Sequence, residues 1–110
     1  MDIQSTEYKR CTVIKANGRI DGSNAPDLAT ALKQLNANGV FNIIFDMSEI
    51  SFMASAGWWV LIDVQKASKP KGGELVLAAV DKGIRESLKL VGMDTYFKIY
   101  DDVTAAVGSF

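Results

Sequence analysis

One run of this 110-residue chain predicts the end of a strand, a loop and a helix: Asp46-Met-Ser-Glu-Ile-Ser-Phe-Met-Ala-Ser55-Ala-Gly-Trp-Trp-Val-Leu-Ile-Asp-Val64. An apolar strand ends at Asp46, and a short loop leads to an apolar helix that begins near Ala56. The first N–H groups of a helix have no partner within it and lie at the positive end of the macrodipole. A phosphate group on Ser55, at the mouth of this helix, would be stabilised there.

Ser55 also has a structural interpretation. Serine is a favoured N-cap residue, worth about 1 kcal/mol over alanine. A helix that starts at Ala56 would use Ser55 as its cap without any role in signalling. The position alone does not separate the two interpretations.

Composition limits the classes of function. The formal charge of −1 comes from 12 basic and 13 acidic residues without a basic run, so nucleic acid is not an expected partner. The chain has no histidine, which excludes the commonest hydrolase sites and most zinc sites. Cys11 is the single cysteine, and we interpret it as a small buried strand residue. We expect neither a cofactor nor a metal.

The polar N-terminus is unlike a signal peptide, and no apolar run approaches the roughly 20 residues that span a bilayer. We therefore expect a cytoplasmic protein without membrane insertion. Without a linker-like run, residues 1–110 are expected to form a single domain.

Hydrophobic periodicity alternates between strands and helices along the chain. Asn24 is predicted to cap the first helix, with Asp27 completing a capping box and Asn38-Gly39 ending it. Asn17-Gly18 is predicted to close the second strand, and Val91 to share the buried face of the third helix. The alternation predicts an α/β fold with a mainly parallel mixed sheet of four to five strands and about four helices. The expected strands lie around residues 3–8, 10–15, 41–46, 74–79 and 97–100, and the expected helices around 25–38, 56–67, 84–91 and 102–107.

Three ordered runs resemble the STAS family, the sulphate-transporter and anti-sigma-factor-antagonist domain. They are Gly18-Arg-Ile-Asp21-Gly-Ser-Asn-Ala-Pro-Asp-Leu28, Ile43-Ile-Phe-Asp46-Met-Ser-Glu-Ile-Ser-Phe-Met-Ala-Ser55-Ala-Gly57 and Gly72-Gly-Glu-Leu-Val-Leu-Ala78. A free-standing copy most resembles the bacterial anti-sigma factor antagonist, which implies a binding module and kinase substrate and not an enzyme. The resemblance implies that the unmodified protein binds a serine kinase that is also an anti-sigma factor, that phosphorylation of a serine releases it, and that a serine phosphatase restores binding.

The resemblance also implies the site residues. The usual motif reads Asp-Ser-Ser-Gly with the second serine as acceptor, and Ala56 stands at that position here, one residue after Ser55. Three alternatives follow: Ser55 is the acceptor, Ser51 or Ser48 is, or this copy has lost the switch. The implied partner-binding residues around the acceptor are Asp21, Ser23, Asn24, Met53, Ala54, Ala56, Gly57, Trp58 and Trp59.

Asp21 has two interpretations. By resemblance it helps to dock the kinase or orients the serine hydroxyl, and otherwise it organises its own turn. Asp46 is interpreted as a loop organiser, since a carboxylate without histidine, metal or a second carboxylate is weak evidence for catalysis. Lys69-Pro-Lys-Gly-Gly73 is interpreted as a turn and not as a phosphate-binding loop, because it lacks Gly-Lys-Ser/Thr and follows a helix.

Trp58 and Trp59 are adjacent indoles on a predicted helix, where neighbouring side chains point about 100° apart. One of them is expected to face outward, where tryptophan often forms an interface hot spot. The alternative is that both are buried beneath the terminal helix. Met47 and Met53 fit either a core edge or an adaptable binding surface.

Two other classes of function remain open. A STAS-like copy without the usual acceptor could be a permanent accessory subunit of a larger assembly, such as a lipid-transport ABC complex, with the indoles as anchors. A small-ligand or anion binder is the third class, suggested by the helix N-terminus itself.

Overall fold

Strands and helices alternate along the chain after an initial hairpin. The computed structural model describes residues 1–110. The strands are β1 (Ile3–Glu7), β2 (Thr12–Ile20), β3 (Asn42–Met53), β4 (Glu74–Ala78) and β5 (Ile99–Tyr100). The helices are α1 (Ala25–Ala37), α2 (Ser55–Ser68), α3 (Lys82–Leu90) and α4 (Val103–Gly108), and two short 3-10 turns are η1 (Lys69–Lys71) and η2 (Asp94–Tyr96).

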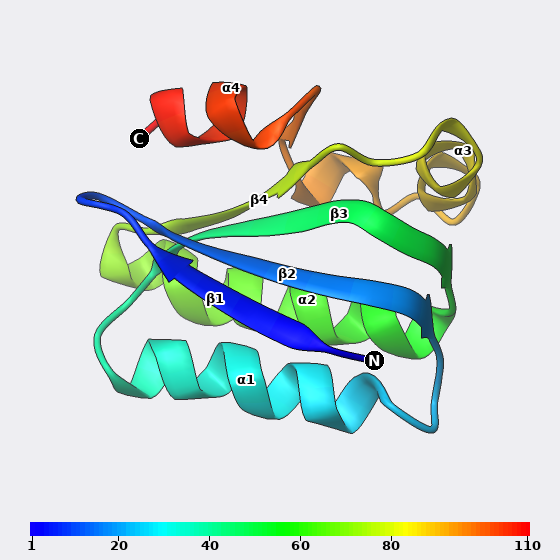
Figure 1. Ribbon diagram of the computed structural model, residues 1–110, viewed down its shortest axis with the longest axis horizontal. Coiled ribbons are helices and arrows are strands. Elements are labelled where there is room, and N and C mark those ends of the chain that lie inside the picture. Colours follow the sequence, from blue (N-terminus) through cyan, green and yellow to red (C-terminus); the bar gives the residue numbers. More distant parts are fainter.

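The five strands form one mixed sheet in the order β1-β2-β3-β4-β5 (Figure 1). β1 and β2 are antiparallel and joined as a hairpin, whereas β2, β3, β4 and β5 run parallel. The connections from β2 to β3 and from β3 to β4 are the helices α1 and α2, as parallel pairing requires. The predicted α/β class, strand number and helix number are confirmed.

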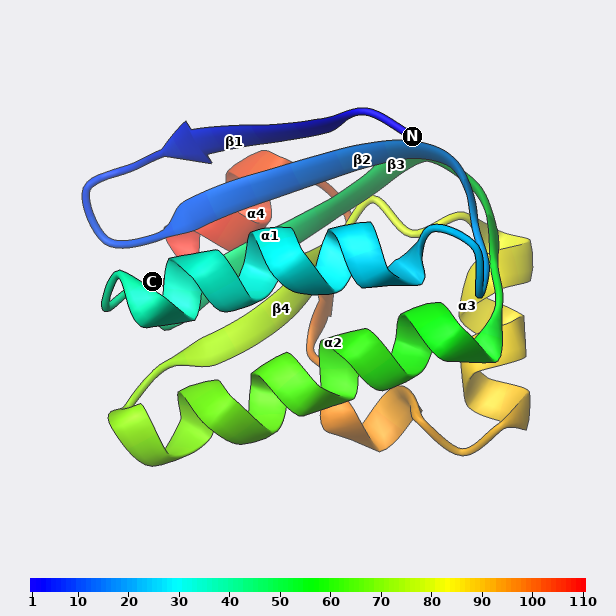
Figure 2. The same cartoon turned by 90° about the horizontal axis from the view of Figure 1, so that it is seen from below.

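The helices lie in different places around the sheet. α1 and α2 lie side by side across one face (Figure 2), and α4 covers part of the other face (Figure 1). α3 stands at the end of the sheet where β3 leads into α2 (Figure 1). Because the carboxyl ends of parallel strands share one edge, the connections that follow β2 and β3 meet at this end.

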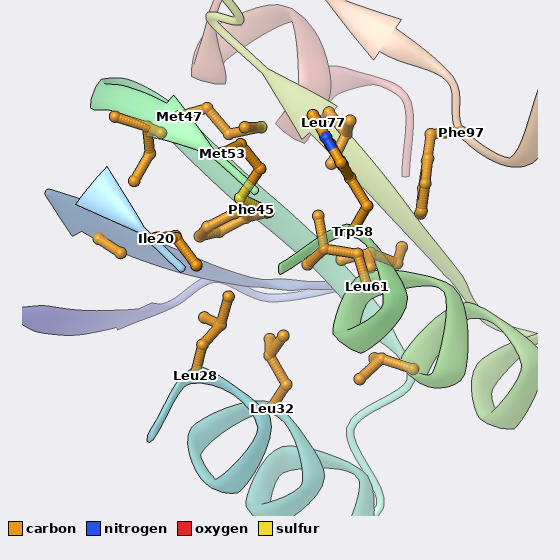
Figure 3. Close-up of a cluster of buried hydrophobic side chains, with 14 of the residues drawn as sticks. Ile20, Leu28, Leu32, Phe45, Met47, Met53, Trp58, Leu61, Leu77 and Phe97 are labelled. Atoms are coloured by element: carbon orange, nitrogen blue, oxygen red, sulfur yellow. The ribbon is translucent and has the colours of Figure 1, made fainter. Parts of the chain in front are cut away.

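The larger core lies between the sheet and the α1–α2 layer (Figure 3). Ile43 and Phe45 face this core, while Ile44 faces the smaller core beneath α4, as the predicted doubly buried strand requires. Leu28 and Leu32 are fully buried from α1, as predicted. Burial of these side chains stabilises the fold by about 1.5 to 3 kcal/mol each.

Two predicted strand ends are wrong. β2 does not close at Asn17-Gly18, and β3 does not end at Asp46, because the parallel pairing of these strands continues to Ile20 and Met53. Gly18 has a φ of +81°, and the register shifts on both sides of it. The Asn-Gly pair therefore marks a bulge inside a long strand and not a turn.

Three further details differ from the sequence prediction. Val91 is 55% exposed because α3 ends at Leu90, so only Ile84 and Leu88 of that helix are buried. Cys11 is buried as expected, but it lies just before β2, and burial raises the pKa of its thiol. The Lys69–Gly73 segment forms the predicted turn, with the short helix η1 followed by Gly72 at a φ of +79°.

A buried glutamine joins α2 to the sheet. The side chain of Gln65 accepts a hydrogen bond from the N–H of Leu75 (2.7 Å) and donates to the carbonyls of Leu75 (2.9 Å) and Tyr96 (2.7 Å). β5 pairs only with Leu77 and Ala78, so the amide of Gln65 acts in place of a neighbouring strand at the start of β4. This contact also fixes η2 against α2.

Candidate functional site

The candidate site lies where β2 and β3 end and α1 and α2 begin (Figure 1). The N–H of Ala54 donates to the carbonyl of Ile20 at 2.8 Å, which joins the two strand ends directly. Asp21 follows one side of this bond and Ser55 follows the other. The structure thus brings the two connections together, and with them the acidic and hydroxyl side chains that the sequence indicated.

The connection from β2 to α1 is fixed by Asn24. Its Oδ1 accepts from the N–H of Asp21 (2.9 Å), and its Nδ2 donates to the carbonyl of Arg19 (2.8 Å). Asn24 is the N-cap residue of α1, but its side chain makes no capping bond, so the predicted cap and its capping box with Asp27 are wrong in detail. The amide is instead used to hold the loop against the end of β2.

Asp21 organises the same loop. Its Oδ1 accepts from the backbone N–H of Ser23 (2.9 Å) and from the hydroxyl of Ser23 (2.5 Å). The Ser23 hydroxyl, the Ser23 N–H and the charge of Arg19 hold the pKa of Asp21 below its usual value. The turn-organising interpretation of Asp21 is confirmed, and the half-exposed carboxylate lies in the connection that follows Ile20, whose carbonyl is bonded to Ala54.

The start of α2 has no side-chain cap. Ser55 is the first helical residue and Ala54 is the N-cap, with φ −81° and ψ 166°, so the interpretation of Ser55 as an N-cap is wrong. The side chain of Ala54 has no oxygen to offer the N–H groups of the first turn. Ser55 is exposed, and its hydroxyl makes no hydrogen bond to another residue.

This uncapped start predicts a stabilising substitution. Ala54→Ser should raise the free energy of unfolding by about 0.5 to 1 kcal/mol, because Ala54 already has the extended backbone of an N-cap. Urea denaturation of the two proteins measures the difference. Ala29→Ser, in the interior of α1, is the control and should be neutral or destabilising.

The first turn of α2 packs tightly on the strand ends. A Cβ atom added at Gly57 would lie 2.6 Å from Sδ of Met53 and 2.9 Å from Cγ2 of Ile20. Both Met53 and Gly57 are buried, so Met53 belongs to the core and neither residue lies on the surface that a partner could touch. Met47 is fully buried as well. These residues fix the height of Ser55 above the sheet and do not form the site surface.

The two indoles of α2 separate as expected. Trp58 is 3% exposed and points toward Leu77 and Phe97 (Figure 3), whereas Trp59 is 54% exposed. The alternative of two indoles beneath the terminal helix is wrong, because α4 lies on the other face of the sheet. Trp59 follows Ser55 by four residues and so lies one turn further along the same face of α2.

Two residues of this region were missed by the sequence analysis. The guanidinium of Arg19 lies 4.3 Å from the ring centre of Phe52, which is an exposed aromatic residue on β3. The two residues are partners in the parallel register of β2 and β3. Their contact could have been predicted only if both strands had been extended beyond Gly18 and Asp46.

Asp46 does not organise a loop, because no loop follows it. It is buried within β3, and its Oδ1 accepts from the N–H of Ser48 at 3.0 Å. Nearby on the neighbouring strand, Lys15 forms an ion pair with Glu49 at 2.7 Å. Ser48 and Ser51, the alternative acceptors, are exposed on β3 and lie before the helix start.

The comparisons with known proteins agree on the family. The model of the STAS domain matches residues 2–106. The chain belongs to the STAS domain family. It is 23% identical over 93 residues to the anti-sigma-B factor antagonist of Staphylococcus aureus, covering 84% of this chain and 86% of that protein.

Solved structures share the fold of this STAS protein. An anti-sigma factor antagonist from Mycobacterium paratuberculosis superposes with a TM-score of 0.88 and 22% identity, covering 98% of this chain and 92% of the other. The antagonist SpoIIAA in its unphosphorylated form gives 0.84 with 17% identity, covering 98% and 95%. The phosphorylated form of SpoIIAA from Bacillus gives 0.76 with 18% identity, covering 98% of each chain. None of the helices has the length and apolar character that crossing a membrane requires.

Proposed function

We propose that this protein is an anti-sigma factor antagonist or an equivalent partner-switching regulator. Its unmodified form binds a serine kinase that is also an anti-sigma factor, and phosphorylation of Ser55 releases that partner. A serine phosphatase reverses the modification. The protein acts in the cytoplasm as one domain, as a binding module and kinase substrate and not as an enzyme, without nucleic acid or membrane insertion.

The observation that carries this proposal is the free hydroxyl of Ser55 at an uncapped helix start. The hydroxyl of Ser23 is already held by Asp21, and those of Ser48 and Ser51 lie on a strand without a helix N-terminus. A phosphate on Ser55 adds a charge of about −1.5 to −2 at neutral pH. The free N–H groups of the first turn favour it, and the nearby carboxylate of Asp21 adds repulsion toward an approaching acidic surface.

The partner-binding residues that the resemblance implies differ in their burial. Met53, Gly57 and Trp58 are buried and support the surface from below. We name the proposed contact surface the Ser55 face. It consists of the half-buried and exposed residues around the start of α2: Asp21, Ser23, Asn24, Ala54, Ser55, Ala56 and Trp59.

Trp59 is the proposed anchor of the Ser55 face. Trp59→Ala should weaken binding of the kinase by about 2 kcal/mol, the size expected for a hot spot, which is about thirtyfold in Kd. Calorimetry with the purified kinase measures this loss. Tyr8→Ala removes another exposed aromatic side chain, in the hairpin at the opposite end of the sheet, and should leave Kd unchanged.

A second candidate function is favoured by one residue. Ala56 stands where the family usually has its acceptor serine, which suits an accessory subunit bound permanently to a larger assembly such as a lipid-transport ABC complex. Affinity purification from the source cell distinguishes the two functions. Recovery of a serine kinase that modifies Ser55 supports the switch, and recovery of an ATPase subunit without modification supports the accessory role.

A further inference from the structure

The outer face of α3 carries a stripe of three cations, Lys82, Arg85 and Lys89. Their spacing of i, i+3 and i+7 places them on one side of the helix over about 10 Å. All three are exposed, whereas Ile84 and Leu88 face the core. The stripe is therefore presented to whatever approaches α3 from outside.

The cations of this stripe have no partner in the protein. The three ion pairs of the structure, Lys15–Glu49, Lys69–Glu74 and Lys98–Glu74, involve none of them. The macrodipole accounts for Lys89, which lies in the last turn of α3, but not for Lys82, the first residue of the helix, where a positive charge is disfavoured. Three cations on one side of a short helix give this surface a local positive charge.

A groove runs beside the stripe, between α3 and the segment that contains η2 and β5. Its volume is about 490 Å³, and two apolar side chains, Phe97 and Ile99, contribute to its wall. In Figure 2, α3 stands at one end of the molecule, and a short loop leads from it to η2 (orange) along the edge beside α2. A second hollow shares Glu86 and Lys89 with the groove and extends it to Leu90, which is 87% exposed. The groove thus combines unpaired positive charge with apolar surface.

We propose that this groove binds an acidic segment of a partner protein, with carboxylates on the cationic stripe and apolar side chains against Ile99 and Leu90. A concave surface of this size accommodates a few side chains of a peptide. Two acidic residues, Glu86 and Asp94, also line the groove. They would repel the dense negative charge of an anionic bilayer or a nucleic acid, whereas a peptide can place its carboxylates between them.

This second surface is separate from the Ser55 face. It is built by α3, η2 and β5, whereas the Ser55 face is built by the connection from β2 to α1 and by the start of α2. The two surfaces lie at the same end of the sheet, and the residues that line the groove do not include Ser55 or Trp59. A partner could hold the protein through this groove while the Ser55 face exchanges its own partner.

Two matched variants test the proposal. The groove variant neutralises the stripe with Lys82→Gln, Arg85→Gln and Lys89→Gln. The control variant makes the same change in charge at three exposed lysines elsewhere, Lys9→Gln, Lys33→Gln and Lys71→Gln. The probes are a synthetic 12-residue peptide of alternating glutamate and leucine, the same peptide with glutamine for glutamate, and phosphatidylserine vesicles.

NMR titration of the full chain should show the acidic peptide shifting the backbone amides of Lys82–Lys89 and of Phe97 and Ile99. The Kd should rise about tenfold or more in the groove variant and stay unchanged in the control variant. The glutamine peptide should bind the natural protein no more tightly than the acidic peptide binds the groove variant. The proposal is overturned if the acidic peptide causes no shifts in the groove at millimolar concentration, if both triple variants lose affinity equally, or if only the vesicles bind.

Discussion

Ser55→Asp should weaken the binding of the serine kinase about 5- to 150-fold, which corresponds to a coupling free energy of about 1 to 3 kcal/mol. The added carboxylate lies at the centre of the Ser55 face, four residues before Trp59. It also lies at the uncapped start of α2, where a negative charge stabilises the helix by about 0.3 to 1 kcal/mol. The variant should therefore fold at least as stably as the natural protein and still fail to bind.

Titration calorimetry on Ser55→Asp, Ser55→Ala and Ser48→Asp shows whether the loss of kinase affinity requires a negative charge and whether that charge must lie at residue 55. Ser55→Ala should bind with unchanged affinity, because the hydroxyl makes no hydrogen bond within the protein. Ser48→Asp adds the same charge at an exposed position of β3 and should weaken kinase binding less than Ser55→Asp. Equal binding by Ser55→Asp and Ser55→Ala would argue against a switch at this position.

Gln65→Leu should lower the free energy of unfolding by at least about 2 kcal/mol, since the two buried backbone groups of Leu75 lose their partner and each costs about 1 to 3 kcal/mol. The substitution keeps the size of the side chain but leaves three backbone groups unpaired: the N–H and carbonyl of Leu75 and the carbonyl of Tyr96. Gln65 is only 3% exposed, so water cannot replace the amide without opening the contact between α2 and β4.

Urea denaturation measures this loss. Gln34→Leu makes the same substitution on the exposed side of α1 and should change the stability by no more than about 0.5 kcal/mol. A loss below about 1 kcal/mol in Gln65→Leu would mean that the backbone groups find other partners and that the glutamine is not the clamp between α2 and the sheet.

Periodicity predicted the elements well where one face or one stripe is buried. The alternating strand around Ile43–Phe45 and the stripe of Leu28 and Leu32 depend on burial alone, and both lie as expected. The ends of β2 and β3 were not predictable in this way. Exposed residues such as Gly18 and Phe52 are held in these strands by pairing between segments far apart in the sequence.

The same reason explains what was found and missed at the candidate site. The outward position of one indole follows from the geometry of a helix, and Trp59 is indeed the exposed one. The predicted caps were wrong for two reasons. The side-chain amide of Asn24 bonds two backbone groups of the loop before α1, and α2 starts one residue before its apolar pattern. Gln65 gave no signal, because a polar residue in a helix reads as exposed until its backbone partners are known.

Mass spectrometry of the protein after incubation with its own serine kinase and ATP tests the central claim most directly. We expect one phosphate, located by fragmentation on Ser55, in the natural protein and in Ser51→Ala, and none in Ser55→Ala. The phosphorylated protein should no longer co-elute with the kinase in size-exclusion chromatography. An unmodified mass, or a phosphate that persists in Ser55→Ala, would contradict the account.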